Sequence, residues 1–74
     1  MDTKIEKQLV VLQTIILFQE AHGYPPTIRE LCHLTGTSSP STIANRLNQL
    51  KEDGYITWNR AMPRTIRVLK GTNR

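Results

Sequence analysis

Signals that start and stop helices are unusually dense between residues 23 and 54. The pair Pro25 and Pro26 forces an extended link, because the residue before a proline is pushed out of the helical region. Thr27 then has a glutamate three residues later, which is the spacing of a capping box. Gly36 supplies a left-handed stop. The pattern therefore predicts a helix of only about eight residues in this segment.

A second helix start follows almost at once. Ser39 is suited to the N-cap and Pro40 to the first helical position, and Gly54 ends the segment. Ile43, Leu47 and Leu50 form the predicted buried stripe of this helix. Two short helices joined by a tight turn are the arrangement of a helix-turn-helix.

A longer helix is expected over residues 4–22, with Thr3 and Glu6 in capping-box spacing at its start. Its expected apolar stripe consists of Ile5, Leu9, Leu12 and Ile16, widened by Val11, Ile15 and Phe18. Val10 and Leu17 lie away from this stripe on the helical wheel. Either the hairpin covers them, which we favour, or they form a small patch for a partner or a dimer.

The pattern changes after Gly54. Apolar and polar residues alternate over residues 55–58 and 65–68, and the segment between them contains a proline, which predicts a two-stranded hairpin. The second helix should bury Ile28, Leu31, Cys32 and Leu34. Three helices followed by an antiparallel hairpin define a mainly α winged helix-turn-helix. A chain of 74 residues has room for one such domain, expected over residues 1–70 with a frayed end at 71–74.

The net charge of +4 is unevenly distributed along the chain. Residues 55–74 contain five basic residues and no acid, whereas residues 1–54 contain five basic and six acidic residues. A basic, acid-free segment favours a polyanionic partner, because lysine and arginine displace condensed counterions from phosphates. Arginines in the hairpin would repel one another without a partner, so double-stranded DNA is the expected ligand.

The third helix carries short polar side chains opposite its buried stripe. Such side chains can hydrogen-bond to base edges, and the unpaired amides at the helix start can bind a phosphate. The residues expected to contact bases are Ser41, Thr42, Asn45, Asn48 and Gln49. The residues expected to contact phosphates, at the helix start or on the hairpin wing, are Ser38, Ser39, Arg46, Arg60, Arg64 and Arg67.

Other chemistries lack the residues that they require. Cys32 is the single cysteine, and His22 and His33 have no ligand set around them, so we expect no disulfide, metal or other cofactor. We see no catalytic constellation and expect no enzyme activity. Trp58 is expected at the core or at the base of the wing. The absence of a leader or a long apolar run predicts a cytoplasmic, nucleoid-associated protein without a membrane.

The residues also support a family resemblance. The motif Gly-x-Pro-Pro-[Ser/Thr]-x-x-Glu starts at Gly23, and a Ser-Pro pair opens the third helix. With residues 53–56 and 63–69, Leu47, Leu50 and Lys51, the chain resembles the amino-terminal DNA-binding domain of the LexA family of bacterial repressors. The resemblance implies a third helix in the major groove, with Ser39, Ser41, Thr42, Ala44 and Asn45 near bases or phosphates.

The resemblance and the residues together predict a sequence-specific transcription regulator of bacterial or phage origin, with repression as the expected mode. LexA repressors continue into a self-cleaving domain that also dimerises, and this sequence contains no such domain. The chain is then either a fragment of a larger parent chain or a stand-alone regulator, and a homodimer on a palindromic site is compatible with both. The alternative function is a protein-interaction module that binds another regulator or polymerase through Val10 and Leu17.

Overall fold

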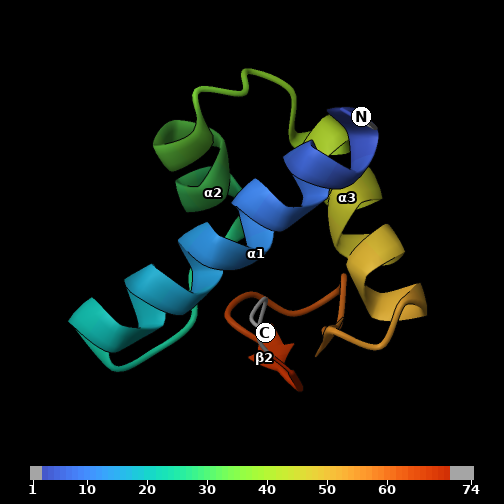
Figure 1. Ribbon diagram of the computed structural model, residues 1–74. Coiled ribbons are helices and arrows are strands. Elements are labelled where there is room, and N and C mark those ends of the chain that lie inside the picture. The colour runs from blue at the N-terminus through green and yellow to red at the C-terminus, as the bar shows by residue number, and fades with distance from the viewer. Residues whose placement is uncertain (1–2, 71–74) are drawn as a thin grey trace.

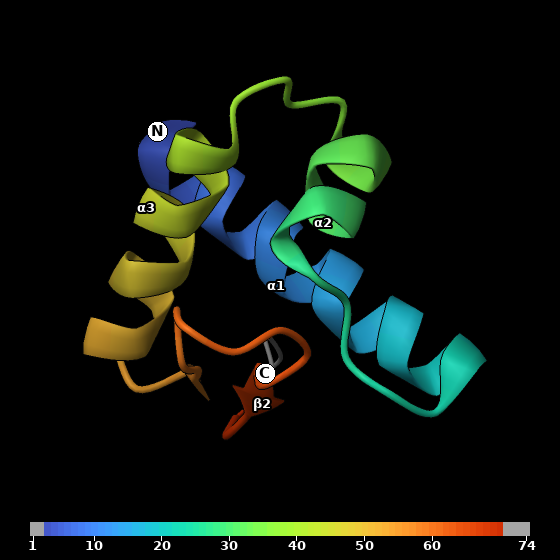
Figure 2. The same ribbon diagram turned by 180° about the vertical axis from the view of Figure 1, so that it is seen from behind.

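The computed structural model describes the backbone of residues 3–70 and the side chains of residues 6–70. Its elements are α1 (Thr3–His22), α2 (Ile28–Thr35), α3 (Pro40–Glu52), β1 (Ile56–Thr57) and β2 (Arg67–Val68). The helices α1, α2 and α3 pack against one another, and the hairpin lies at the opposite end from the turn between α2 and α3 (Figures 1 and 2). The predicted winged helix-turn-helix is confirmed.

Local capping determines where α2 begins and ends. The Thr27 hydroxyl accepts a hydrogen bond from the Glu30 amide at 3.1 Å, and the Glu30 carboxylate accepts one from the Thr27 amide at 2.9 Å. Gly36 closes the helix with a φ of +72° and donates its amide to the Cys32 carbonyl. The predicted capping box and helix length are therefore both confirmed.

The start of α3 also follows its local sequence. The Ser39 hydroxyl accepts a hydrogen bond from the Thr42 amide at 3.3 Å, and Pro40 occupies the first turn, where its missing amide costs nothing. Gly54, with a φ of +84°, turns the chain so that the Tyr55 amide reaches the Leu50 carbonyl at 2.9 Å. These contacts fix the direction in which the chain enters the hairpin.

The apolar core joins all three helices to the hairpin. Its buried residues are Val11, Leu12, Ile15, Leu31, Ile43, Ala44, Leu47, Leu50, Ile56, Trp58 and Ile66. Burying a leucine or isoleucine side chain stabilises a fold by about 1.5–3 kcal/mol, so this cluster is the main source of stability. The expected positions of Ile43, Leu47, Leu50 and Trp58 are confirmed.

The buried face of α1 differs from the prediction. Gln8, which was not expected inside, is buried with Val11, Leu12 and Ile15, whereas Leu9 and Ile16 are only half-buried. Two runs of four apolar residues, 9–12 and 15–18, cover most of the helix circumference, so contacts with α2 and α3 select the face. On α2, Leu34 is exposed rather than buried, because the short helix presents only one residue, Leu31, fully to the core.

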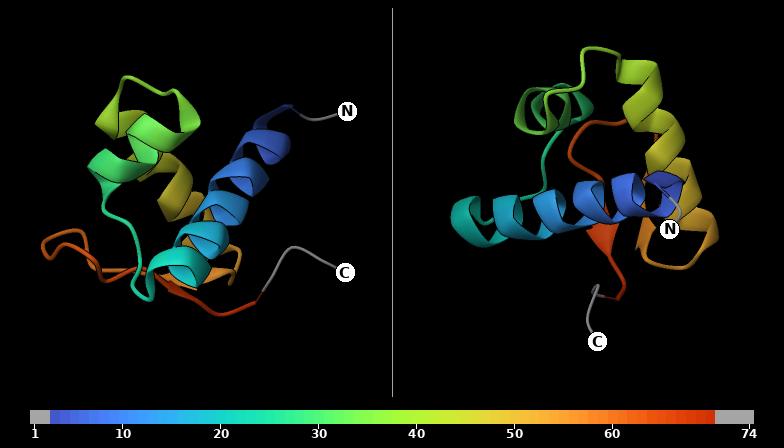
Figure 3. Two further views of the ribbon diagram at one scale, coloured as in Figure 1. Left: turned by 90° about the vertical axis from the view of Figure 1, so that its left-hand side faces the viewer. Right: turned by 45° about the horizontal axis from the view of Figure 1, so that its top comes forward.

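The hairpin is shorter than the alternation predicts. Ile56 pairs with Val68 and Thr57 with Arg67, so each strand contributes two residues. Residues 59–65 form a loop that projects on the same side as α2, away from α1 (Figure 3). The base of the hairpin is buried, so it is anchored to the helices by side chains more than by strand pairing.

Some expectations fall outside the described part of the chain. The side chains of Thr3 and Ile5 and the expected frayed end at residues 71–74 are among them. Within residues 3–70, no helix has the length and apolarity needed to cross a membrane.

Candidate nucleic-acid interface

The polar face of α3 is the first part of the candidate site. Ser41 and Asn45 are exposed, while Thr42, Asn48 and Gln49 are half-buried. Within the described residues, no hydrogen bond engages the side-chain amides of Asn45, Asn48 or Gln49. Their donors and acceptors are therefore available to an external partner, most openly on the first two turns of the helix.

Ala44 does not belong to this face. The resemblance implied that it lies near bases or phosphates, but its side chain is 3% exposed and belongs to the core. Residue 44 lies about 100° from Ile43 on the helix, and α3 is buried widely enough to include it. The implied contact of the Ala44 side chain is therefore wrong.

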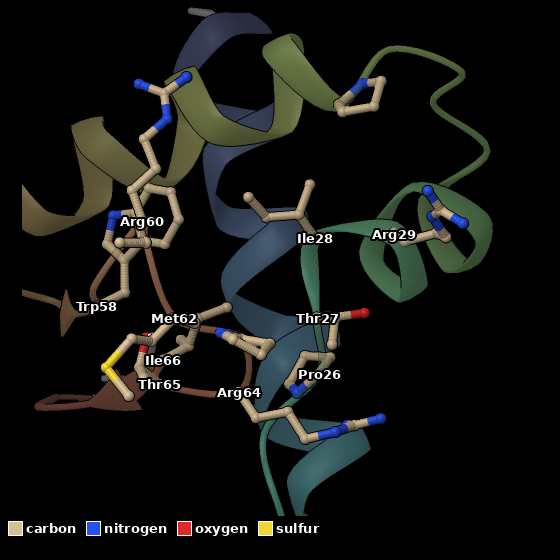
Figure 4. Close-up of a pocket in the computed structure, with 13 residues that line it drawn as sticks. Pro26, Thr27, Ile28, Arg29, Trp58, Arg60, Met62, Arg64, Thr65 and Ile66 are labelled. Carbon is tan, nitrogen blue, oxygen red and sulfur yellow. Dashed lines mark hydrogen bonds between the residues drawn. The ribbon is translucent and has the colours of Figure 1, made fainter.

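A hollow of about 370 Å³ separates the hairpin loop from the start of the helix-turn-helix. Its apolar floor includes Trp58 and Ile66, and Pro40 closes the side formed by α3. Figure 4 shows Arg60 extending from the hairpin side of the hollow towards α3. An open hollow with an exposed guanidinium beside a helix N-terminus is suited to an anionic backbone.

Arg29 also lines this hollow, and the sequence reasoning missed it. It is exposed in the first turn of α2, next to the positive end of the helix dipole, where a cation is unfavourable. A cation in that position was the signal in the sequence that could have identified it. A bound anion would offset the electrostatic cost of placing it there.

The hairpin loop is held in shape by its own polar groups. The Thr65 hydroxyl accepts a hydrogen bond from the Asn59 amide at 2.9 Å and lies 3.0 Å from the carbonyl oxygens of Asn59 and Met62. The Asn59 side chain accepts a hydrogen bond from the Ala61 amide at 2.9 Å. Arg60 is thus carried on an ordered turn, while Met62 is exposed beside it.

Arg64 does not extend freely from the wing. Its guanidinium makes two 3.0 Å hydrogen bonds to the Glu30 carboxylate and a third, also 3.0 Å, to the Pro25 carbonyl. It also lies over the Tyr24 ring, with its central carbon 4.6 Å from the ring centroid. The hairpin contains no acid, and the partner of Arg64 comes from 34 residues earlier in the chain.

This contact changes the ionisation of Glu30. The hydrogen bond from Arg64 is the largest cause that lowers the pKa of the Glu30 carboxyl, and the hydrogen bond from the Thr27 backbone adds to it. The carboxylate therefore stays ionised to a lower pH than an unpaired glutamate would. Glu30 is not among the residues that line the hollow, and its negative charge is paired with the Arg64 guanidinium.

The remaining candidates lie in different places. Ser38 is exposed in the turn and Ser39 and Arg46 are half-buried, all on or beside α3. Arg67 is exposed on β2 and lies in a shallow hollow with Ile16 and Glu20 of α1 rather than in the hollow at the loop. Arg60 therefore lines the same hollow as the start of α3, whereas Arg67 lies outside that hollow.

Val10 and Leu17 are not covered by the hairpin. Their side chains are 54% and 56% exposed on α1. The favoured expectation that the hairpin covers them is therefore wrong. Their role as a partner patch stays a prediction.

Comparisons with known proteins agree with this geometry. The family model described as the LexA DNA binding domain matches residues 1–65. The LexA repressor of Desulfatibacillum aliphaticivorans is 44% identical over 70 residues, covering 95% of this chain and 34% of that protein. The LexA repressors of Limosilactobacillus fermentum and Moorella thermoacetica are 42% and 45% identical, covering 84% and 81% of this chain and 30% and 29% of their own lengths.

These relatives come from bacteria, and this chain spans about a third of their length. The matched region includes the helix-turn-helix and the hairpin loop. On this evidence the chain belongs to the LexA DNA-binding domain family.

Proposed function

We propose that the chain binds double-stranded DNA in a sequence-specific manner and represses transcription by occupying a promoter. The observation that carries the proposal is the polar face of α3, whose amide side chains have no hydrogen-bond partner within residues 6–70, together with a hollow at the start of α3 that is lined by Arg29 and Arg60. The relatives that match the chain are named as repressors, which supports the regulatory part of the proposal.

In this proposal α3 enters the major groove and its side chains bind base edges. Ser41 and Asn45 have the leading role, because they are exposed near the helix N-terminus, the part of a recognition helix that contacts bases. Asn45 can form a bidentate pair with adenine. The half-buried residues Thr42, Asn48 and Gln49 would contact bases at the edges of the site.

The DNA backbone would lie along the hollow between α3 and the hairpin loop. Arg60 and Arg29 would bind phosphates there, with Ser38, Ser39 and Arg46 at the start and side of α3. The hairpin loop would follow the backbone or enter the minor groove, whose negative potential attracts arginine. Phosphate contacts by Arg67 stay a prediction, since it lies on the side of the hairpin next to α1.

Selection from a random duplex pool at low and moderate salt tests the proposal. An enriched motif is expected, and its symmetry would report whether two copies bind together. A single module of this size buries about 600–1,000 Å² on DNA, so tight binding calls for paired sites or a longer parent chain. Salt-sensitive binding without any motif would contradict sequence-specific recognition.

The role of Asn45 is tested separately with Asn45→Ala. We expect the variant to accept several bases at one position of the motif while its binding to unrelated sequences stays the same. Gln13→Ala is the matched control, because Gln13 is also exposed and lies on α1. Equal losses on every sequence for Asn45→Ala would contradict a role in base recognition.

A second candidate function rests on the exposure of Val10 and Leu17. An apolar patch on α1 is suited to a protein partner, so the domain would act as an interaction module for another regulator or polymerase. This alternative predicts a stoichiometric protein complex and no salt-sensitive DNA binding. Replacing both residues with serine is expected to abolish that complex, and a complex that survives the double substitution would contradict this alternative.

A further inference from the structure

Arg64 has an unusual backbone as well as an unusual set of contacts. Its φ is +57°, a left-handed backbone conformation that residues other than glycine and asparagine rarely adopt. A residue is held in such a conformation when its surroundings favour one geometry strongly. Here the surroundings are the Glu30 carboxylate, the Pro25 carbonyl and the Tyr24 ring.

These contacts join the hairpin loop to the entrance of the helix-turn-helix. Arg64 lies near the end of the loop, whereas Tyr24 and Pro25 belong to the link before α2 and Glu30 to its first turn. Figure 4 shows Arg64 pointing away from α3, in the direction opposite to Arg60. The guanidinium of Arg64 is thus directed at the protein rather than across the hollow.

The Glu30 carboxylate takes part in two sets of hydrogen bonds at once, one to the capping box and one to Arg64. Its Oε1 atom accepts the Thr27 amide at 2.9 Å in the capping box and also the Arg64 Nη1 atom at 3.0 Å, while Oε2 accepts Nη2. Any movement of the loop away from α2 breaks these bidentate contacts, because the planar guanidinium of Arg64 can make both of them in one orientation only. The position of the loop is therefore coupled to the N-terminus of α2.

We propose that Arg64 and Glu30 form a clamp that sets the distance between the hairpin loop and the helix-turn-helix, so that Arg60 is positioned for a DNA phosphate. Arg64 is then a positioning residue and not itself a phosphate ligand. The inference rests on the proposed function, because it specifies how the same surface is held ready for DNA.

The substitution Glu30→Gln separates the clamp from a purely electrostatic role, because the two predict opposite signs. If Arg64 is a phosphate ligand that Glu30 restrains, removal of the negative charge releases it, and DNA binding becomes tighter and more salt-dependent. If the clamp positions Arg60, binding becomes weaker and less salt-dependent. Loss of one phosphate contact lowers the affinity about eightfold at 0.1 M salt, which is the expected effect.

The variant is well suited to the test because glutamine still fits the capping box. The start of α2 is therefore retained while the ionic part of the Arg64 contact is removed. Glu6→Gln is the matched control, since it removes the same charge from an exposed position on α1 that lines neither the hollow at Arg60 nor the one at Arg67. Arg64→Lys is a second test: it retains the positive charge but loses the bidentate geometry, and the clamp predicts the same weakening as in Glu30→Gln.

A measurement without DNA keeps the clamp distinct from the proposed function. Backbone NMR order parameters of residues 59–65 should fall in Glu30→Gln and Arg64→Lys, while those of α3 stay at the wild-type values. If wild-type protein binds no duplex, the proposed function fails, and these order parameters alone decide whether the loop is clamped. Unchanged order parameters, or tighter DNA binding by Glu30→Gln, would overturn the clamp.

Discussion

Replacement of Arg60 by glutamine tests whether its position beside the hollow, rather than the total charge of the domain, determines DNA binding. Arg60 is exposed on the hairpin loop and extends towards α3, so one guanidinium is available for one phosphate. Glutamine keeps a polar side chain and removes the charge. The order of the loop should remain, because its internal hydrogen bonds come from Asn59 and Thr65.

The expected size of the effect follows from counterion release. Each phosphate contact adds about 0.9 to the slope of log affinity against log salt concentration. Arg60→Gln should therefore reduce that slope by about 0.9, and between 0.05 and 0.2 M salt the variant should lose about 3.5-fold less affinity than the wild-type protein. Fluorescence anisotropy titrations with the selected duplex at four or five salt concentrations would measure both slopes.

Arg67→Gln is the matched control for this measurement. It removes the same charge from the same hairpin, but Arg67 lies next to Ile16 and Glu20 of α1. A smaller change in slope is therefore expected for Arg67→Gln than for Arg60→Gln. Equal changes would refute the argument, because they would mean that the hollow beside α3 does not distinguish the two arginines.

The stability of the domain should depend on its core, on the cap of α2 and on the contact between Arg64 and Glu30. Leu47→Ala should reduce the free energy of unfolding by about 2–5 kcal/mol, measured by urea denaturation, because Leu47 is fully buried. Thr27→Ala should cost about 1 kcal/mol by removing the cap of α2, whereas Thr14→Ala, at a half-buried position within α1 where the hydroxyl donates to the Val10 carbonyl of the same helix, should cost less; melting temperatures would compare the two. Because Arg64 lowers the pKa of Glu30, the ionised carboxylate stabilises the fold above its ordinary pKa, and this contribution is lost as the pH falls through the lowered value. The wild-type melting temperature should therefore fall more between about pH 5 and pH 3 than that of Glu30→Gln, and parallel curves would contradict this assignment.

The helix boundaries were predictable because their causes are local. The cap at Thr27, the proline at residue 40 and the glycine at residue 36 each act on amides and carbonyls within four residues. Such contacts form independently of how the helices pack against one another. The element order, and with it the fold class, followed from these signals and from the change of period after Gly54.

The orientation of α1 and the partner of Arg64 were not predictable in the same way. Apolar residues surround much of α1, so its buried face depends on where α2 and α3 pack. The contact between Arg64 and Glu30 joins residues 34 positions apart, and charge counting along the chain does not reveal such a pair. Both features depend on tertiary structure.

The hairpin has two residue pairs but three buried anchors, Ile56, Trp58 and Ile66. Its base should therefore unfold together with the helices, because core packing and not strand pairing holds it. Residues 60–63 lie outside that packing and are exposed. Substitutions at the loop tip can then accumulate without loss of the fold, so the preference of this domain for one groove or another can evolve separately from its stability.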